Sequence, residues 1–315
     1  MAVLYDNSGK IIQIGGVNEI WDNSGLVYKY QKPAPTHDYS QDYLTFEAIS
    51  AGTFSFNRPY SYSVDDGSTW TSLAASASTP TVNAGDKILF KATNEPNSSV
   101  GVGTFSATSE FNAMGNPYSM FSGDSFTSVT TLPVFAVSRL FYLNTNLVSA
   151  ENLSLPALDL GSETYSCYYE TFMGCTSLTT APELPATSLH DSCYHNMFSG
   201  CTSLTTAPAL PATTLSNGCY SYMFDGCTSL TTAPELLADT LTATCYIYMF
   251  SGCTSLNYVK MTATNVDMAF YPNYAMQHML TNASATGTFV KAASVANLPT
   301  GDYGVPTGWT IVDAT

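Results

Sequence analysis

The chain has 315 residues, a length that predicts two or three domains, and its formal net charge is −15 at pH 7. Only 10% of its residues are charged, and no Lys or Arg occurs from Leu140 to Val259, against nine Asp and Glu residues. Binding to nucleic acid or to an anionic membrane requires a basic surface, so the composition excludes both partners. No run of 18 apolar residues occurs, so we expect no membrane insertion either.

Residues 1–32 contain a duplicated pattern, Tyr5–Ile14 and Trp21–Tyr30, in which an Asn-Ser-Gly sequence separates two β-prone runs. This pattern is typical of a β-hairpin, so we expect two hairpins. Hairpins this small expose strand edges and need a partner. We expect them to anchor the chain to other subunits or a larger assembly; docking on the next domain is the equal alternative. The start of the printed sequence also predicts no export signal.

Two prolines predict a linker over residues 33–42, and short alternating segments then predict a β-sandwich over 43–117. The expected strands lie at 43–49, 52–56, 60–64, 69–73, 87–92 and 101–106. Ser63–Trp70 resembles the Asp box of sialidase-like propellers, Ser-x-Asp-x-Gly-x-Thr-Trp. In those folds the box closes a hairpin, with its Trp packed inside, and is not catalytic. The chain has only two arginines, too few for sialidase chemistry.

From Cys167 to Leu256 one phrase occurs four times with a period of 26 residues, and it contains all eight cysteines. Weaker copies occur at 119–124 and 140–147, which makes about six turns. A fixed period with apolar residues in phase predicts a solenoid over residues 118–262, with a short strand and a short helix in each turn. The open end of such an array requires a cap, which we assign to residues 263–315, with strands at 287–291 and 308–312.

The repeated phrase Phe-x-Gly-Cys-Thr-Ser-Leu, followed by a Leu-Pro dipeptide, resembles the BspA-type (treponemal) leucine-rich repeat. The resemblance extends from Ser119 to about Met261, although the repeat here is longer than is usual for that family. It implies a binding function, because members of the family are mostly surface adhesins of gut and oral bacteria and similar arrays occur in proteins of their phages.

The cysteines are candidates for disulfides, metal ligands or buried thiols. Equivalent residues of successive turns lie roughly 5 Å apart, the distance between strands, so a ladder of buried reduced thiols is favoured. We assign Cys175, Cys201, Cys227 and Cys253 to such a structural ladder. His190, Cys193 and His195 are the one cluster that resembles a metal site, but the pattern occurs in a single turn. We therefore expect no metal and no cofactor.

Residues that flank the first cysteine of each turn change while the rest of the phrase stays constant. They include Tyr169, His195, Tyr222 and Tyr248, which we expect along one side of the solenoid as a binding surface. Rigid aromatic residues among adaptable polar ones are typical of recognition surfaces, but drift on an exposed face would look the same. No nucleophile with a neighbouring base is apparent, so we expect no enzyme activity.

The sequence thus predicts a mainly β protein that is structural and recognises a surface. The resemblance favours a phage head or tail fibre or a decoration protein at the virion surface. Its expected partners are other virion proteins, through the N-terminal element, and a glycan or protein of the host surface; a homo-oligomer is compatible with this. The first alternative is an adhesin at the bacterial cell surface, and the second is a carbohydrate-active module.

Overall fold

The computed structural model describes residues 37–98, 101–155, 165–267 and 274–314, together with the backbone of four short strands before residue 37. Contacts divide the chain into two compact units, Met1–Asp38 and Tyr39–Thr315. The protein is mainly β, with its strands distributed over several sheets, as the sequence predicted. Within the described residues, no helix has the length and hydropathy needed to cross a membrane.

The first unit contains two antiparallel strand pairs, β1 (Leu4–Tyr5) with β2 (Ile11–Ile12) and β3 (Glu19–Asp22) with β4 (Gly25–Lys29). They confirm the two predicted hairpins, although residues 6–10 and 23–24 of the turns lie outside the described residues. Residues 33–36 of the predicted linker also lie outside them, and the rest of it, residues 37–42, contains a 3-10 helix, η1, at Tyr39–Gln41 in the second unit.

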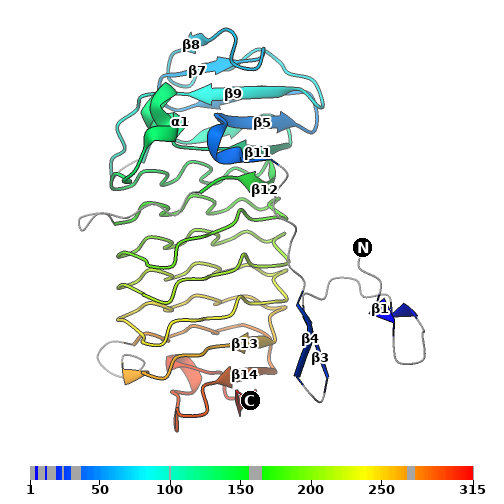
Figure 1. Ribbon diagram of the computed structural model, residues 1–315, viewed down its shortest axis with the longest axis vertical. Coiled ribbons are helices and arrows are strands. Elements are labelled where there is room, and N and C mark those ends of the chain that lie inside the picture. Colours follow the sequence, from blue (N-terminus) through cyan, green and yellow to red (C-terminus); the bar gives the residue numbers. More distant parts are fainter. Residues whose placement is uncertain are drawn as a thin grey trace. The chain divides into compact units, whose positions relative to one another are not determined.

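The second unit begins with a six-stranded sheet, in the order β12-β11-β5-β9-β7-β8, and a two-stranded sheet, β10-β6 (Figure 1). The strands are β5 Leu44–Ala48, β6 Phe54–Phe56, β7 Tyr60–Ser63, β8 Thr71–Leu73, β9 Lys87–Lys91, β10 Phe105–Ala107, β11 Phe111–Gly115 and β12 Leu147–Leu153. Strands β5 to β10 confirm the six predicted strands. The two sheets pack through buried phenylalanines; the Phe46 ring centroid lies 5.2 Å from that of Phe54 and 4.8 Å from that of Phe105.

A helical segment, α1 (Ser119–Ser122) and the 3-10 helix η2 (Gly123–Ser128), follows β11. The first weak copy of the repeat was predicted here, and that prediction was wrong. The segment is tied to the sheet instead: the Ser119 hydroxyl accepts a hydrogen bond from the backbone N–H of Leu44 and donates one to the carbonyl of Phe90. These bonds fix α1 beside β9, so the segment adopts a local helix and not the backbone of a repeat.

The backbone of each repeat is a run of tight turns. In the turn that contains Cys167, the N–H of Tyr168 donates to the carbonyl of Cys193 in the next turn (3.1 Å). The N–H of Tyr169 donates to Ser166, three residues earlier (3.2 Å). The two patterns alternate along the chain, and every fourth residue has a positive φ, as at Ser166 (55°) and Glu170 (55°).

This backbone corrects the prediction of a short helix and a short strand in each turn. A left-handed residue at every fourth position interrupts an α-helix, and half of the N–H groups that a helix would use bond to the neighbouring turn. On the other side of each described repeat, single parallel bridges such as Ser188–Thr214 and Thr206–Thr232 replace a continuous strand. Turns and bridges together connect each repeat to the next.

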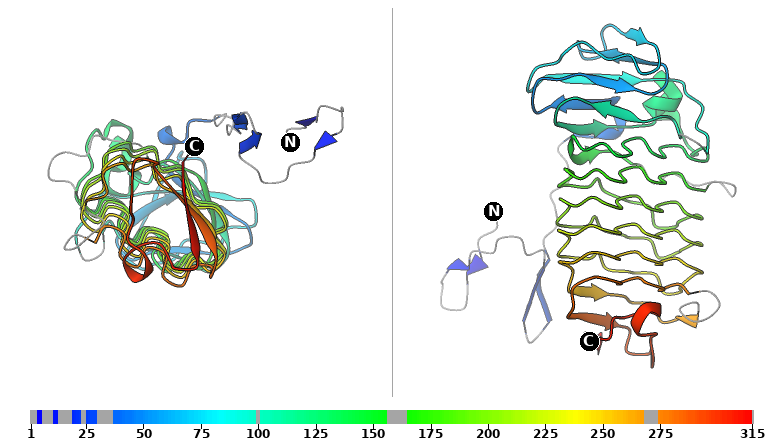
Figure 2. Two further views of the ribbon diagram at one scale, coloured as in Figure 1. Left: turned by 90° about the horizontal axis from the view of Figure 1, so that it is seen from below. Right: turned by 180° about the vertical axis from the view of Figure 1, so that it is seen from behind.

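Successive turns of the chain lie side by side between β12 and β13 (Tyr258–Lys260), and they superimpose when seen along the stack (Figures 1 and 2). Their core is a ladder of stacked phenylalanine rings with centroids 5.3–5.6 Å apart, formed by Phe141, Phe172, Phe198, Phe224 and Phe250. Phe141 also lies 5.8 Å from Phe46 of the six-stranded sheet. The stack and the sheets therefore share one continuous core.

The C-terminal region adds a further turn that the sequence analysis missed. Tyr274, His278 and Asn282 repeat the positive φ at every fourth residue, and the N–H of Tyr246 donates to the carbonyl of Ala275 (2.9 Å). The three parallel strands β13, β14 (Gly287–Lys291) and β15 (Trp309–Asp313) follow, and the 3-10 helix η4 (Gly301–Tyr303) lies between the last two. Strands β14 and β15 confirm the two strands predicted in this region.

Candidate functional site

An aromatic column, here called the outer column, extends along one side of the stack. Tyr169 stacks on His195 with centroids 5.1 Å apart and planes at 6°, and Tyr222 stacks on Tyr248 at 4.6 Å and 7°. His195 and Tyr222 join these pairs at 5.6 Å, and His278 continues the column 4.6 Å beyond Tyr248. All five rings are partly exposed. The structure thus brings the four predicted surface residues into one column and adds His278.

The repeat position that supplies the ring shifts by one residue between the upper half of the column, Tyr169 and His195, and its lower half, Tyr222, Tyr248 and His278. Tyr169 and His195 are 26 residues apart, and the next residue in that series is Ser221. Ser221 is buried, and its hydroxyl donates to the carbonyl of Thr244 (2.8 Å). The aromatic ring comes instead from Tyr222, one residue later, and this shift coincides with the 54° tilt between the rings of His195 and Tyr222.

The lower half of the column uses backbone positions with positive φ. Tyr222 has a φ of 56°, Tyr248 of 54° and His278 of 53°. A side chain in this conformation is strained, whereas glycine adopts it freely. Four residues after Tyr222 and Tyr248, the same conformation is adopted by Gly226 and Gly252. The same conformation also occurs outside the column, at Ser166, Asn196 and Thr244, so it is a property of the backbone of the turns.

An ion pair lies at the upper end of the outer column. The Arg139 Nε lies 2.7 Å from the Glu170 Oε2, and the guanidinium lies 5.6 Å from the ring centroid of Tyr169. Glu170 is buried, and burial together with Glu170 raises the pKa of the Tyr169 hydroxyl. Because the charges of Arg139 and Glu170 compensate each other, the upper end of the column is close to neutral.

The imidazole of His195 is also neutral near pH 7. Burial lowers its pKa below the ordinary 6.5, while the charge of Glu170 acts in the opposite direction. The column therefore offers a partner phenol hydroxyls and the neutral imidazole of His195, which donate or accept hydrogen bonds.

The metal-like cluster of the sequence does not converge in the structure. Cys193 is fully buried in the core, whereas His195 lies in the outer column between Tyr169 and Tyr222. His190 is partly exposed. Across the described ranges, no group of three His, Cys, Asp or Glu residues is placed to hold a metal ion.

All eight cysteines are buried and free of disulfides. The thiols of the structural ladder each donate to a phenylalanine carbonyl of the preceding turn at 3.0–3.1 Å; they are Cys175, Cys201, Cys227 and Cys253. Burial raises the pKa of Cys253 to about 12, so the thiol keeps the proton that it donates. The ladder is therefore part of the core and offers no reactive thiolate at neutral pH.

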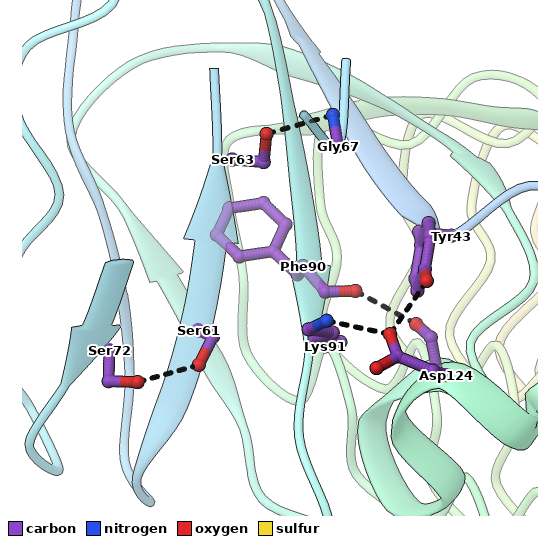
Figure 3. Close-up of polar contacts among 9 residues, drawn as sticks. Tyr43, Ser61, Ser63, Gly67, Ser72, Phe90, Lys91 and Asp124 are labelled. Atoms are coloured by element: carbon purple, nitrogen blue, oxygen red, sulfur yellow. Dashed lines mark hydrogen bonds and ion pairs between the residues drawn. The ribbon is translucent and has the colours of Figure 1, made fainter. Parts of the chain in front are cut away.

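The Asp-box segment closes the hairpin between β7 and β8. The Ser63 hydroxyl accepts a bond from the N–H of Gly67 (2.9 Å; Figure 3). Asp65 accepts bonds from the N–H and hydroxyl of Thr69. The bonds from Thr69, and then that from Ser63, lower the pKa of the exposed Asp65 carboxyl to about 2. The segment stabilises a turn, as its resemblance implied.

Trp70 of this segment is half-buried and is not enclosed in the core, where it was expected. Its ring meets Tyr43 edge-on, with centroids 4.9 Å apart, and the Lys91 ammonium lies 4.1 Å above it. The Asp124 carboxylate accepts from Tyr43 (2.7 Å) and pairs with Lys91 (2.6 Å; Figure 3). The Tyr43 hydroxyl, the Lys91 ammonium and the Asp124 carboxylate thus have partners within this cluster, which indicates a structural role.

Sequence reasoning missed Arg139 and His278 as parts of the candidate site. The signal for His278 was the phrase Met279-Leu280-Thr281-Asn282, which corresponds to Met-Phe-Ser-Gly in the turn before it. Comparison of the chain with protein-family models, with curated proteins and with solved structures found no match.

Proposed function

We propose that this chain is a non-enzymatic recognition protein on the outside of a phage particle, as a fibre or decoration protein, and that its outer column contacts the surface of a bacterial host. The observation that carries the proposal is the outer column itself. Partly exposed rings from five successive turns follow one another without interruption, although the position that supplies the ring shifts by one residue at Tyr222.

The framework for this surface is, in our proposal, a leucine-rich-repeat-like solenoid with a β-sandwich at its N-terminal end. Three features support it: the hydrogen bonds from each turn to the next, the phenylalanine ladder through the core, and the sheet pairing of β12 with β11. In such an array each turn contacts only its neighbours, so outward side chains can change from turn to turn without disturbing the core.

Recognition fits the chemistry of the outer column better than catalysis does. His195, the imidazole at its centre, is flanked on both sides by aromatic rings, and its pKa is lowered by burial. Stacked rings and neutral polar groups hold a partner by contact area and hydrogen bonds. A carbohydrate-active enzyme would need paired carboxylates at a fixed separation, whereas Glu170 beside the column is paired with Arg139.

The N-terminal unit supports attachment to a particle. Met1–Asp38 forms its own compact unit with two strand pairs, each with edges able to pair with another chain. A small attachment element joined to a larger recognition body is the arrangement that a fibre or decoration protein requires. An adhesin at the bacterial cell surface is the alternative, since the repeat phrase resembles proteins of both settings.

Two measurements test the proposal. The purified, fluorescently labelled chain should adsorb to some members of a panel of gut and oral bacterial strains, and adsorption to none would contradict recognition. Mass spectrometry of phage particles purified from the source of the gene should detect the chain. Its detection in the envelope of uninfected cells, and not in particles, would favour the adhesin.

A further inference from the structure

We infer that the partner of the outer column is an uncharged polysaccharide that lies along the stack and is recognised through the edges of the rings. This inference rests on the proposed function and names the class of its ligand. It follows from three features of the column: which parts of the rings are covered, which polar groups are unpaired, and what charge surrounds them.

The faces of the rings are largely covered by their neighbours. Tyr248 has Tyr222 on one face, with planes at 7°, and His278 on the other, at 28°. A ligand therefore cannot stack on Tyr248, and it meets the edge of the ring with its hydroxyl. Protein partners obtain most of their affinity from aromatic side chains buried in pockets, so a column of covered faces offers them little.

The edges of the lower rings present unpaired polar groups. Within the described part of the chain, the hydroxyls of Tyr222 and Tyr248 have no hydrogen-bond partner, although both rings are half-buried. A phenol hydroxyl without a partner in the protein is available to a ligand hydroxyl, to which it can donate and from which it can accept. Successive centroids in the column lie 4.6–5.6 Å apart, so similar groups recur at short, regular intervals. A ligand that itself repeats hydroxyl-rich units matches this pattern.

The charge around the column excludes an acidic polymer. No Lys or Arg occurs from Leu140 to Val259, while Asp and Glu residues do, and Arg139 at the upper end is paired with Glu170. Phosphate, sulfate or carboxylate groups along a ligand would meet no free cation in this stretch and would be repelled. A neutral polysaccharide carries the hydroxyls without the repulsion.

The double variant Tyr222→Phe/Tyr248→Phe tests this inference, because it removes both hydroxyls and keeps both stacked rings. The probe is an array of bacterial polysaccharides that includes neutral members and members with phosphate, sulfate or uronic acid groups. We expect the wild-type chain to bind neutral members, with affinity unchanged between about 0.05 and 0.5 M salt, since screening acts on charged contacts. We expect the double variant to bind them about tenfold more weakly, from the loss of two hydrogen bonds. Tyr258→Phe, at an exposed tyrosine outside the column, is the control and should bind like wild type.

Three outcomes would overturn the inference: binding of acidic members alone, binding of no member, or undiminished binding by the double variant. Cell adsorption separates this failure from failure of the proposed function. If the wild-type chain and the double variant adsorb equally to a strain, recognition stands but does not use these hydroxyls. If the wild-type chain adsorbs to no strain, the proposed function itself fails.

Discussion

The inner ladders, which are the buried columns of phenylalanine and cysteine side chains, and the outer column arise from the same backbone at nearly the same spacing. They differ in how constant the residue type is from one turn to the next. Inside, Phe172, Phe198 and Phe224 repeat one side chain with planes at 5–7° and centroids 5.3–5.6 Å apart. Outside, both tyrosine and histidine occur, and the column shifts position at Tyr222. Close packing determines the inner residues, because a changed volume there is felt by both neighbouring turns.

The outer column is free of that constraint, yet it remains aromatic through five turns. Its rings also occupy two different backbone positions and still form one continuous stack. Packing alone explains why the same position carries the same residue type in every turn, as in the inner ladders. Packing does not explain why the rings remain stacked although the position that supplies them changes by one residue. This difference is why we assign recognition to the outer residues.

The largest effect that separates the two regions is expected on stability. Phe198→Ala removes a ring from the middle of the inner ladder and should lower the free energy of unfolding by about 3–5 kcal/mol, through lost burial and a cavity. Tyr222→Ala in the outer column should cost about 1 kcal/mol or less, because its ring is half-buried. Denaturant unfolding of both variants measures this, and equal losses would contradict the distinction.

The thiols provide a second contrast, in reactivity. All eight cysteines are buried, and burial raises the pKa of Cys245 to about 12, so neither thiolate nor access is available in the folded protein. A thiol reagent without reductant should find almost no reactive cysteine in the native chain and eight after unfolding. Fewer than six reactive cysteines after unfolding would mean that disulfides form and that the cysteines of the inner ladders are not all reduced.

A smaller effect tests the strained backbone of the outer column. Tyr222 has a φ of 56°, a conformation that glycine adopts without strain and alanine does not. The Tyr222→Gly variant should therefore be as stable as Tyr222→Ala or more stable, by up to about 1 kcal/mol. At ordinary helical positions the order is reversed, so a clearly more stable alanine variant would show that this residue is not left-handed.

The sequence predicted the elements whose signal is local or periodic. Strand alternation located β5 to β10, and the 26-residue phrase located the stacked turns and their buried cysteines. A Gly after an apolar run usually marks the end of a helix, and the glycine of each phrase therefore favours the predicted short helix. In the structure, Gly174 and Glu170 share the same left-handed conformation, which a glutamate in the sequence does not predict.

The outer column was only partly predictable for the same reason. Variation between repeats identified Tyr169, His195, Tyr222 and Tyr248 as one group, but their stacking depends on ring positions that shift by one residue. A fixed 26-residue period does not reveal a change of one residue in the position that supplies the ring. His278 was hidden further because residues 257–273 break the period before the last turn begins. Arg139 belongs to a turn whose spacing to the next turn differs from 26 residues. Its ion pair with Glu170 could therefore be identified only in the structure.

The most direct test of the central claim is a variant that removes the outer column and leaves the inner ladders intact. Tyr169, His195, Tyr222 and Tyr248 are replaced together by alanine, and unfolding experiments establish that the variant is folded at the assay temperature. Adsorption to a strain that binds the wild-type chain should then fall by tenfold or more, because each aromatic anchor at a recognition surface contributes about 1–3 kcal/mol. A folded quadruple variant that adsorbs like wild type would contradict the account and leave the stack as a spacer.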